Sequence, residues 1–207
     1  INDVPLKEVP LLSNFQMNLE ELENAIDENT KLIFFCSPNN PTGNSIDRED
    51  IEMVLNNFDG LVVIDEAYIN YSRYRSVVSE LKDYPNRVVM QTFSKAWGRA
   101  ALRLGMNFAS TEIIDILNKI KPPYNINQAT QELAMKALDH LEDVNTMIKE
   151  TVREREELVK NLAQLPLVQK VYPSDANFVL AKMTDATAVY NYLKETGIIV
   201  RNRSNVI

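Results

Sequence analysis

Residues 31–44 read KLIFFCSPNNPTGN. Two later stretches have the same pattern: LVVIDE at 61–66 and RVVMQTFSK at 87–95. Each begins with a continuous apolar run, which is typical of a strand buried on both faces of a sheet, and each ends in polar or turn-forming residues. Between the first two stretches, apolar residues recur at helical spacing from Ile51 to Phe58, after the candidate N-cap Asp47. Strands that alternate with helices predict an α/β fold with a mostly parallel sheet flanked by helices.

The character of the chain changes after a fourth expected strand at 104–109. Apolar spacing predicts a helix over 113–120 and almost continuous helix over 126–165. A smaller set of elements is expected to follow: strands at 168–172, 177–181 and 198–200, and a helix over 186–195. We therefore expect a large domain over 1–145 and, over 146–207, an interdomain helix with a small α+β domain. Because the chain opens without Met and holds only five glycines, we expect it to be part of a longer protein, with both domains incomplete.

Composition narrows the classes of function. The 22 Lys and Arg residues against 29 Asp and Glu residues give a net charge of −7, which argues against nucleic acid or an anionic membrane as the main partner. The single cysteine, Cys36, excludes an internal disulfide, and the single histidine, His140, excludes a histidine-rich metal site. We expect no bound metal. No apolar run approaches the roughly 18 residues of a membrane span, so a cytoplasmic protein is expected.

Polar residues follow each of the first three predicted strands. Asn40 lies in the turn after the first strand, Asp65 and Tyr68 follow the second, and Ser94 and Lys95 follow the third. Because ligands bind outside the carboxyl ends of the strands in an open parallel sheet, we expect these side chains to converge on one edge. With Thr92 at the end of the third strand, that edge would hold an amine, a carboxylate, an amide, a phenol and two hydroxyls.

Each motif also has an ordinary explanation when it is taken alone. Asn-Pro-Thr-Gly at 40–43 is first of all a turn sequence, and most lysines are solvated surface residues. An apolar run that ends in Asp65-Glu66 also has the shape of a Walker B segment, which holds Mg²⁺ in P-loop enzymes. That interpretation needs a glycine-rich loop ending in Gly-Lys-Ser/Thr, and the sequence contains none.

The motifs in combination are specific. The chain resembles the histidinol-phosphate aminotransferases, in the class I/II branch of the fold-type I pyridoxal-phosphate (PLP) enzymes. The resemblance rests on SPNNPTGN at 37–44, VIDEAY at 63–68, TFSKA at 92–96, LRLG at 102–105, ANFV at 176–179 and GIIVR at 197–201. It extends over essentially the whole chain. The sequence departs from the commonest family wording at 97–101, WGRAA, but the spacing from Lys95 to Arg103 is intact.

The resemblance implies a role for each residue of the set. Lys95 would bind PLP covalently and transfer a proton during catalysis, with Asp65 facing the pyridine nitrogen and Asn40 and Tyr68 reaching the phenolic oxygen. The phosphate would be held by Thr92, Ser94 and Arg103. Arg201 is the candidate for the anionic end of the substrate, and Asn177 is a candidate for the wall of the substrate site.

The implied activity is transfer of an amino group between L-histidinol phosphate and 2-oxoglutarate in histidine biosynthesis, by a homodimer. Two alternatives stay open. One is another PLP enzyme of the same branch, such as an aromatic-amino-acid aminotransferase or a threonine-phosphate decarboxylase. The other is a transcriptional regulator with a PLP-binding domain, which would carry a basic winged-helix segment upstream.

Overall fold

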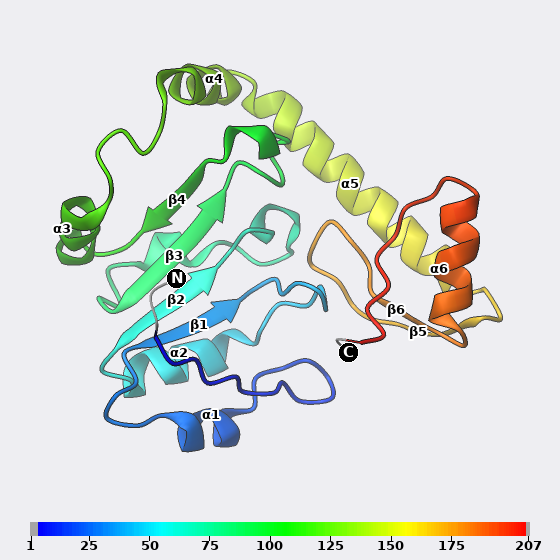
Figure 1. Cartoon of the computed structure of the whole chain (residues 1–207), viewed down its shortest axis with the longest axis horizontal. Coiled ribbons are helices and arrows are strands. Elements are labelled where there is room, and N and C mark those ends of the chain that lie inside the picture. Colours follow the sequence, from blue (N-terminus) through cyan, green and yellow to red (C-terminus); the bar gives the residue numbers. More distant parts are fainter. Residues whose placement is uncertain (1–3, 206–207) are drawn as a thin grey trace.

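The computed structural model describes residues 4–205, and its main sheet has the strand order β1-β2-β3-β4. The strands are β1 (Leu32–Cys36), β2 (Leu61–Asp65), β3 (Arg87–Thr92) and β4 (Gly105–Phe108). The first three are parallel, and β4 runs antiparallel to β3. The expected α/β fold with a mostly parallel sheet is confirmed, and all four expected strands of the sheet are present (Figure 1).

Six α-helices and three short 3₁₀ helices accompany the strands within the described residues. The α-helices are α1 (Leu19–Ala25), α2 (Arg48–Asn57), α3 (Thr111–Ile120), α4 (Gln128–Leu138), α5 (Leu141–Leu162) and α6 (Ala186–Glu195). The 3₁₀ helices are η1 (Ile69–Tyr71), η2 (Val77–Glu80) and η3 (Ala100–Leu102). The expected helix over 126–165 is in fact two helices, because the chain turns at Asp139 and His140. No helix among residues 4–205 combines the length and the apolar character that crossing a bilayer requires.

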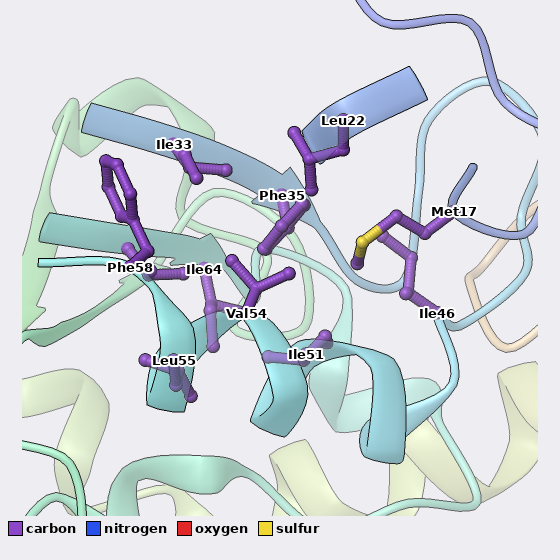
Figure 2. Close-up of a cluster of buried hydrophobic side chains, with 11 residues drawn as sticks. Met17, Leu22, Ile33, Phe35, Ile46, Ile51, Val54, Leu55, Phe58 and Ile64 are labelled. Carbon is purple, nitrogen blue, oxygen red and sulfur yellow. The ribbon is translucent and has the colours of Figure 1, made fainter. Parts of the chain in front are cut away.

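The largest apolar core lies between α2 and one face of the main sheet. Ile51, Val54 and Leu55 come from one side of α2, as their helical spacing predicts, and they pack with strand residues such as Ile33 and Ile64 (Figure 2). α1 adds Leu22 to the same cluster. Burying a side chain of this size stabilises the fold by about 1.5–3 kcal/mol. The core therefore fixes β1 and β2 and, through them, the loops that follow both strands.

The expectation that β1 is buried on both faces is wrong. Its residues alternate between exposed and buried, and Phe34 on the open face is 61% exposed. β1 is the edge strand of the sheet, and α2 covers only the face that carries Ile33 and Phe35. The apolar run in the sequence could not distinguish a strand covered on one face from a strand covered on both.

The long helix α5 runs diagonally from the main sheet toward a second, smaller set of elements (Figure 1). This set contains an antiparallel pair, β5 (Val168–Val171) and β6 (Ala181–Met183), followed by α6. The expected strand at 168–172 and helix at 186–195 are confirmed. The division of the chain at residues 145 and 146 stays a prediction.

Two other expected strands of this unit differ from the structure. The strand expected at 177–181 starts only at its last residue, Ala181, as β6. Residues 174–178 form a turn instead, because Ser174 Oγ donates to the carbonyl of Phe178 and accepts from the amide of Ala176. Such local side-chain bonds compete with a strand ladder. Residues 198–200 are irregular, and Ile199 is 70% exposed.

Candidate active site

The carboxyl ends of β2 and β3 border a cavity of about 510 Å³. Its walls include five residues that the sequence singles out: Asp65, Thr92, Ser94, Lys95 and Arg103. The cavity extends onto Gly105, Met106 and Asn107 at the start of β4. Because β4 is antiparallel to β3, its first residues lie beside the last residues of β3. The structure thus brings the carboxylate, the amine and the guanidinium to one place.

Asp65 is the last residue of β2 and is partly exposed. Its Oδ1 accepts a hydrogen bond of 2.9 Å from the backbone amide of Ala67, which fixes the orientation of the carboxylate. Within residues 4–205, Oδ2 has no hydrogen-bond or ion-pair partner. Asp65 is therefore an oriented carboxylate with one oxygen available to a ligand.

Lys95 lies in the turn after β3, which the hydrogen bond from the Gly98 amide to the Lys95 carbonyl closes at 3.0 Å. Its Nζ is 5.1 Å from the centroid of the Tyr68 ring, and the side chain is exposed. In the part of the chain that the structure describes, no carboxylate forms an ion pair with Lys95 or Arg103. Both cations are therefore available to an anionic or carbonyl ligand.

Asn40 and Tyr68 form a pair next to this cavity. The Asn40 side-chain amide donates a 2.7 Å hydrogen bond to the Tyr68 hydroxyl. The Tyr68 ring is buried, and Phe178 meets it edge-on, with the ring centroids 5.2 Å apart and an interplanar angle of 87°. The Tyr68 ring is thus fixed by packing against Phe178, and its hydroxyl is held by Asn40.

The hydroxyl of Thr92 is committed within the protein. Its Oγ1 accepts from the Ser94 amide at 3.0 Å and donates to the Leu104 carbonyl at 3.2 Å. Arg103 has a left-handed backbone with φ 50°, and one of its terminal nitrogens donates to the Ala100 carbonyl. The remaining guanidinium N–H groups and the Ser94 hydroxyl suit an anion such as a phosphate, because arginine binds phosphate oxygens in pairs. Thr92 shapes the turn that presents them.

The structure does not bring Asn177 or Arg201 into the cavity. Asn177 borders a separate groove of about 470 Å³ that α5 lines with Met147, Arg155 and Leu158. Its side chain also reaches the hydroxyl of Tyr71, where it lowers the Tyr71 pKa against a larger rise caused by burial. Arg201 is exposed and lies in an irregular segment. The substrate roles of both residues stay predictions.

Glu66, the second residue of the Asp-Glu pair, is 2% exposed. Its carboxylate accepts hydrogen bonds from the Ser76 hydroxyl, the Val77 amide and the Gln91 side chain, at 2.5–2.9 Å. These bonds occupy the carboxylate, so it is not free to hold Mg²⁺ as a Walker B segment would. No group of three or more His, Cys, Asp or Glu side chains suited to a metal lies within the described residues.

Sequence reasoning missed several residues around the site. Met106 and Asn107 were missed because nothing in the sequence shows that β4 is antiparallel. Phe178 was quoted within the ANFV motif, but no signal pointed to its contact with Tyr68. Asp175 was missed as well, because no local pattern shows that its carboxylate is buried.

With this geometry established, comparisons with known proteins identify the family. Residues 1–206 match the family model for aminotransferase class I and II. The chain belongs to the class I and II aminotransferases. Histidinol-phosphate aminotransferase of Flavobacterium psychrophilum is 53% identical over 205 residues, which are 99% of this chain and 59% of that protein. The enzyme of the same name from Bacteroides thetaiotaomicron is 53% identical over 206 residues, which cover 60% of its length. This aminotransferase chain thus spans about 60% of the length of these curated relatives.

Solved structures give the same fold. The crystal structure of histidinol-phosphate aminotransferase from Sinorhizobium meliloti in complex with pyridoxal-5'-phosphate is 25% identical, with a TM-score of 0.84 over 95% of this chain and 56% of that one. L-threonine-O-3-phosphate decarboxylase from Porphyromonas gingivalis is 26% identical, with a TM-score of 0.75 over 88% of this chain and 57% of that one. The aminotransferase fold predicted from the sequence is confirmed.

Proposed function

We propose that the protein is a PLP-dependent transaminase that interconverts L-histidinol phosphate plus 2-oxoglutarate and imidazole acetol phosphate plus L-glutamate. One observation carries the proposal: Asp65, Lys95 and Arg103 border a single cavity, with the carboxylate oriented and, within residues 4–205, neither cation in an ion pair. The two relatives at 53% identity, both named histidinol-phosphate aminotransferase, support this substrate. We further propose a cytoplasmic homodimer that takes part in histidine biosynthesis.

The donor set of the cavity fits PLP. The cofactor has an aldehyde, a ring nitrogen, a phenolic oxygen and a phosphate, and the site offers a complement to each. Lys95 is the amine for the aldehyde, Asp65 is the carboxylate for the protonated ring nitrogen, and Ser94 with Arg103 are the donors for the phosphate. Asn40 and Tyr68 supply the amide and the phenol for the phenolic oxygen. When bound, PLP supplies a ring that accepts electrons from the substrate carbon.

The protein's own groups then hold charges and move a proton. The Asp65 carboxylate would keep a proton on the ring nitrogen, which is electrostatic stabilisation by a preorganised charge. Arg103 would neutralise the phosphate and hold the cofactor in place. The Lys95 amine would act as a positioned general base and acid, taking a proton from the substrate carbon and giving one back. Arg201 is the candidate partner of the substrate phosphate.

The first experiment is a visible absorbance spectrum of the purified protein with added PLP. We expect the wild type to show an absorbance band of protein-bound PLP that is lost in Lys95→Ala. The band should be kept in Lys182→Ala, a control that removes an exposed lysine of β6. A band that survives in Lys95→Ala would refute the role of Lys95. No band in the wild type would refute the proposed cofactor.

A panel of substrates then tests the reaction. The likeness to L-threonine-O-3-phosphate decarboxylase makes decarboxylation the second candidate. L-Histidinol phosphate with 2-oxoglutarate should give the highest kcat/KM, with glutamate as product. Faster release of CO₂ from threonine phosphate would favour the decarboxylase, and preference for a phosphate-free aromatic amino acid would favour an aromatic-amino-acid aminotransferase. Binding of PLP without turnover of any of these substrates would favour the regulator domain.

A further inference from the structure

Asp175 is a buried carboxylate that the proposed chemistry does not use. It is 3% exposed and lies in the turn at 174–178, which follows β5. Its Oδ1 accepts a 2.9 Å hydrogen bond from Arg73 Nε, and its Oδ2 lies 3.4 Å from the backbone nitrogen of Ser45. Its own amide donates to the Gly43 carbonyl at 2.7 Å. One residue thus joins three segments that are far apart in the sequence.

Each of these segments carries a residue of the Asn40–Tyr68 pair or packs on it. Gly43 and Ser45 belong to the turn that contains Asn40, and Arg73 follows the 3₁₀ helix η1 that Tyr68 precedes. The turn of Asp175 also contains Phe178, whose ring meets the ring of Tyr68. The contacts of Asp175 therefore link the segment that carries Asn40 to the segment that follows Tyr68.

A second cation strengthens this junction. Arg155 of α5 donates to the Tyr71 carbonyl at 3.1 Å and to the Ala176 carbonyl at 2.8 Å, so it also joins the η1 segment to the same turn. Burial lowers the pKa of Arg155, and the nearby Asp175 carboxylate opposes that effect. The pKa of Arg73 shifts in the opposite direction to that of Arg155, because the hydrogen bond to Asp175 raises it. Asp175 is the acidic centre between two arginines.

We propose that Asp175 is a positioning residue: it holds the Asn40 turn and the Tyr68 segment in register, so that the amide and the phenol meet the same ligand atom. A buried carboxylate is costly unless it is paired, and both of its oxygens are used to join these segments. The turn at 174–178 thereby couples the smaller, C-terminal set of elements to the site on the main sheet. The consequence for catalysis rests on the proposed function, while the structural coupling does not.

The structural coupling is tested by amide hydrogen exchange on the full-length protein without substrate. Asp175→Asn keeps the size of the side chain but removes its charge. We expect exchange of the amides in 40–46 and 66–73 to rise by about tenfold or more, because local opening becomes easier. Asp185→Asn is the matched control, since Asp185 caps α6 at an exposed position and touches none of these segments. Equal exchange in the two variants would overturn the proposal.

The catalytic consequence is tested by kinetics with a double-mutant cycle. Misplacing a catalytic group by about 1 Å can cost up to about 100-fold, so we expect kcat of Asp175→Asn to fall by about 10- to 100-fold while Asp185→Asn is unchanged. In a Tyr68→Phe background the same substitution should cost less than about threefold, because the phenol that it aligns with the Asn40 amide is already gone. Arg73→Gln, a change at an exposed side chain, should repeat the loss if Asp175→Asn folds poorly. If the kcat losses of Asp175→Asn and Tyr68→Phe multiply in the double variant, the proposal is overturned. If the wild type shows no PLP band, the proposed function is overturned instead, and hydrogen exchange alone decides the role of Asp175.

Discussion

Asn40 Nδ2 lies 2.7 Å from the Tyr68 hydroxyl, although 28 residues separate them and neither belongs to a strand. Each follows the carboxyl end of a different parallel strand, β1 for Asn40 and β2 for Tyr68. The register between those strands, in which Cys36 pairs with Asp65, brings the two loops together. A sheet formed by apolar packing thus assembles a polar pair.

The hydroxyl of Tyr68 can be removed without removing its ring. In Tyr68→Phe, we expect kcat to fall by about 100-fold, the usual cost of losing one donor to a developing charge. The thermal unfolding midpoint should change little, because the ring still packs against Phe178. Steady-state kinetics and a melting curve check this. A full kcat would show that the phenol takes no part in the reaction.

Changing a carboxylate to an amide should affect turnover at Asp65 but stability at its neighbour Glu66. Asp65→Asn keeps an oxygen that accepts from the Ala67 amide, so the fold should persist while kcat falls by about 100-fold or more. Glu66→Gln disturbs a buried carboxylate with three donors, and should reduce the free energy of unfolding by about 1–3 kcal/mol. Urea unfolding and turnover separate the two effects. A loss of stability confined to Asp65→Asn would contradict this assignment.

The sequence was informative where one local signal dominated. The helix expected at 186–195 begins and ends as predicted, since apolar spacing decides such an element locally. The convergence of Asp65 with Lys95 also followed from the sequence alone, because parallel strands present their carboxyl ends at one edge.

The remaining features depend on contacts between distant residues, which no local pattern contains. Phe34 is exposed because α2 covers only the opposite face of the edge strand β1. The antiparallel direction of β4 depends on a connection that contains no crossover helix. The strand expected at 177–181 starts only at Ala181, because Ser174 bonds to the Phe178 carbonyl and forms a turn at 174–178. The contact between Asp175 and Arg73 spans 102 residues.

Tyr71 gives the protein a predictable response to alkaline pH. Burial raises its pKa above the ordinary value of 10.0, so the folded protein holds the phenolic proton more tightly than the unfolded chain does. The resulting stabilisation is complete below pH 10, the unfolded value, and is lost as the pH rises through the folded value. We expect the urea midpoint of the wild type to fall more steeply with pH than that of Tyr71→Phe between about pH 9 and 11. This window is set by the pKa of a free tyrosine, which is about 10. Parallel slopes for the two proteins would contradict the prediction.

Gly43 and Gly197 have almost the same backbone conformation, with φ of 84° and 85°, but different surroundings. A Cβ on Gly43 would lie 2.8 Å from Ser174 Oγ, whereas a Cβ on Gly197 would have no neighbour within 4 Å. Alanine at either position should cost about 1–2 kcal/mol for the left-handed conformation. Gly43→Ala should cost more, because Ser174 is held by its 2.6 Å bond to the Phe178 carbonyl and cannot move away freely. In the double variant Gly43→Ala/Ser174→Ala, the loss of stability should be smaller than the sum of the single losses, since the crowding oxygen is gone. Equal urea midpoints for Gly43→Ala and Gly197→Ala would show that the turn at 174–178 does not press on the Asn40 loop.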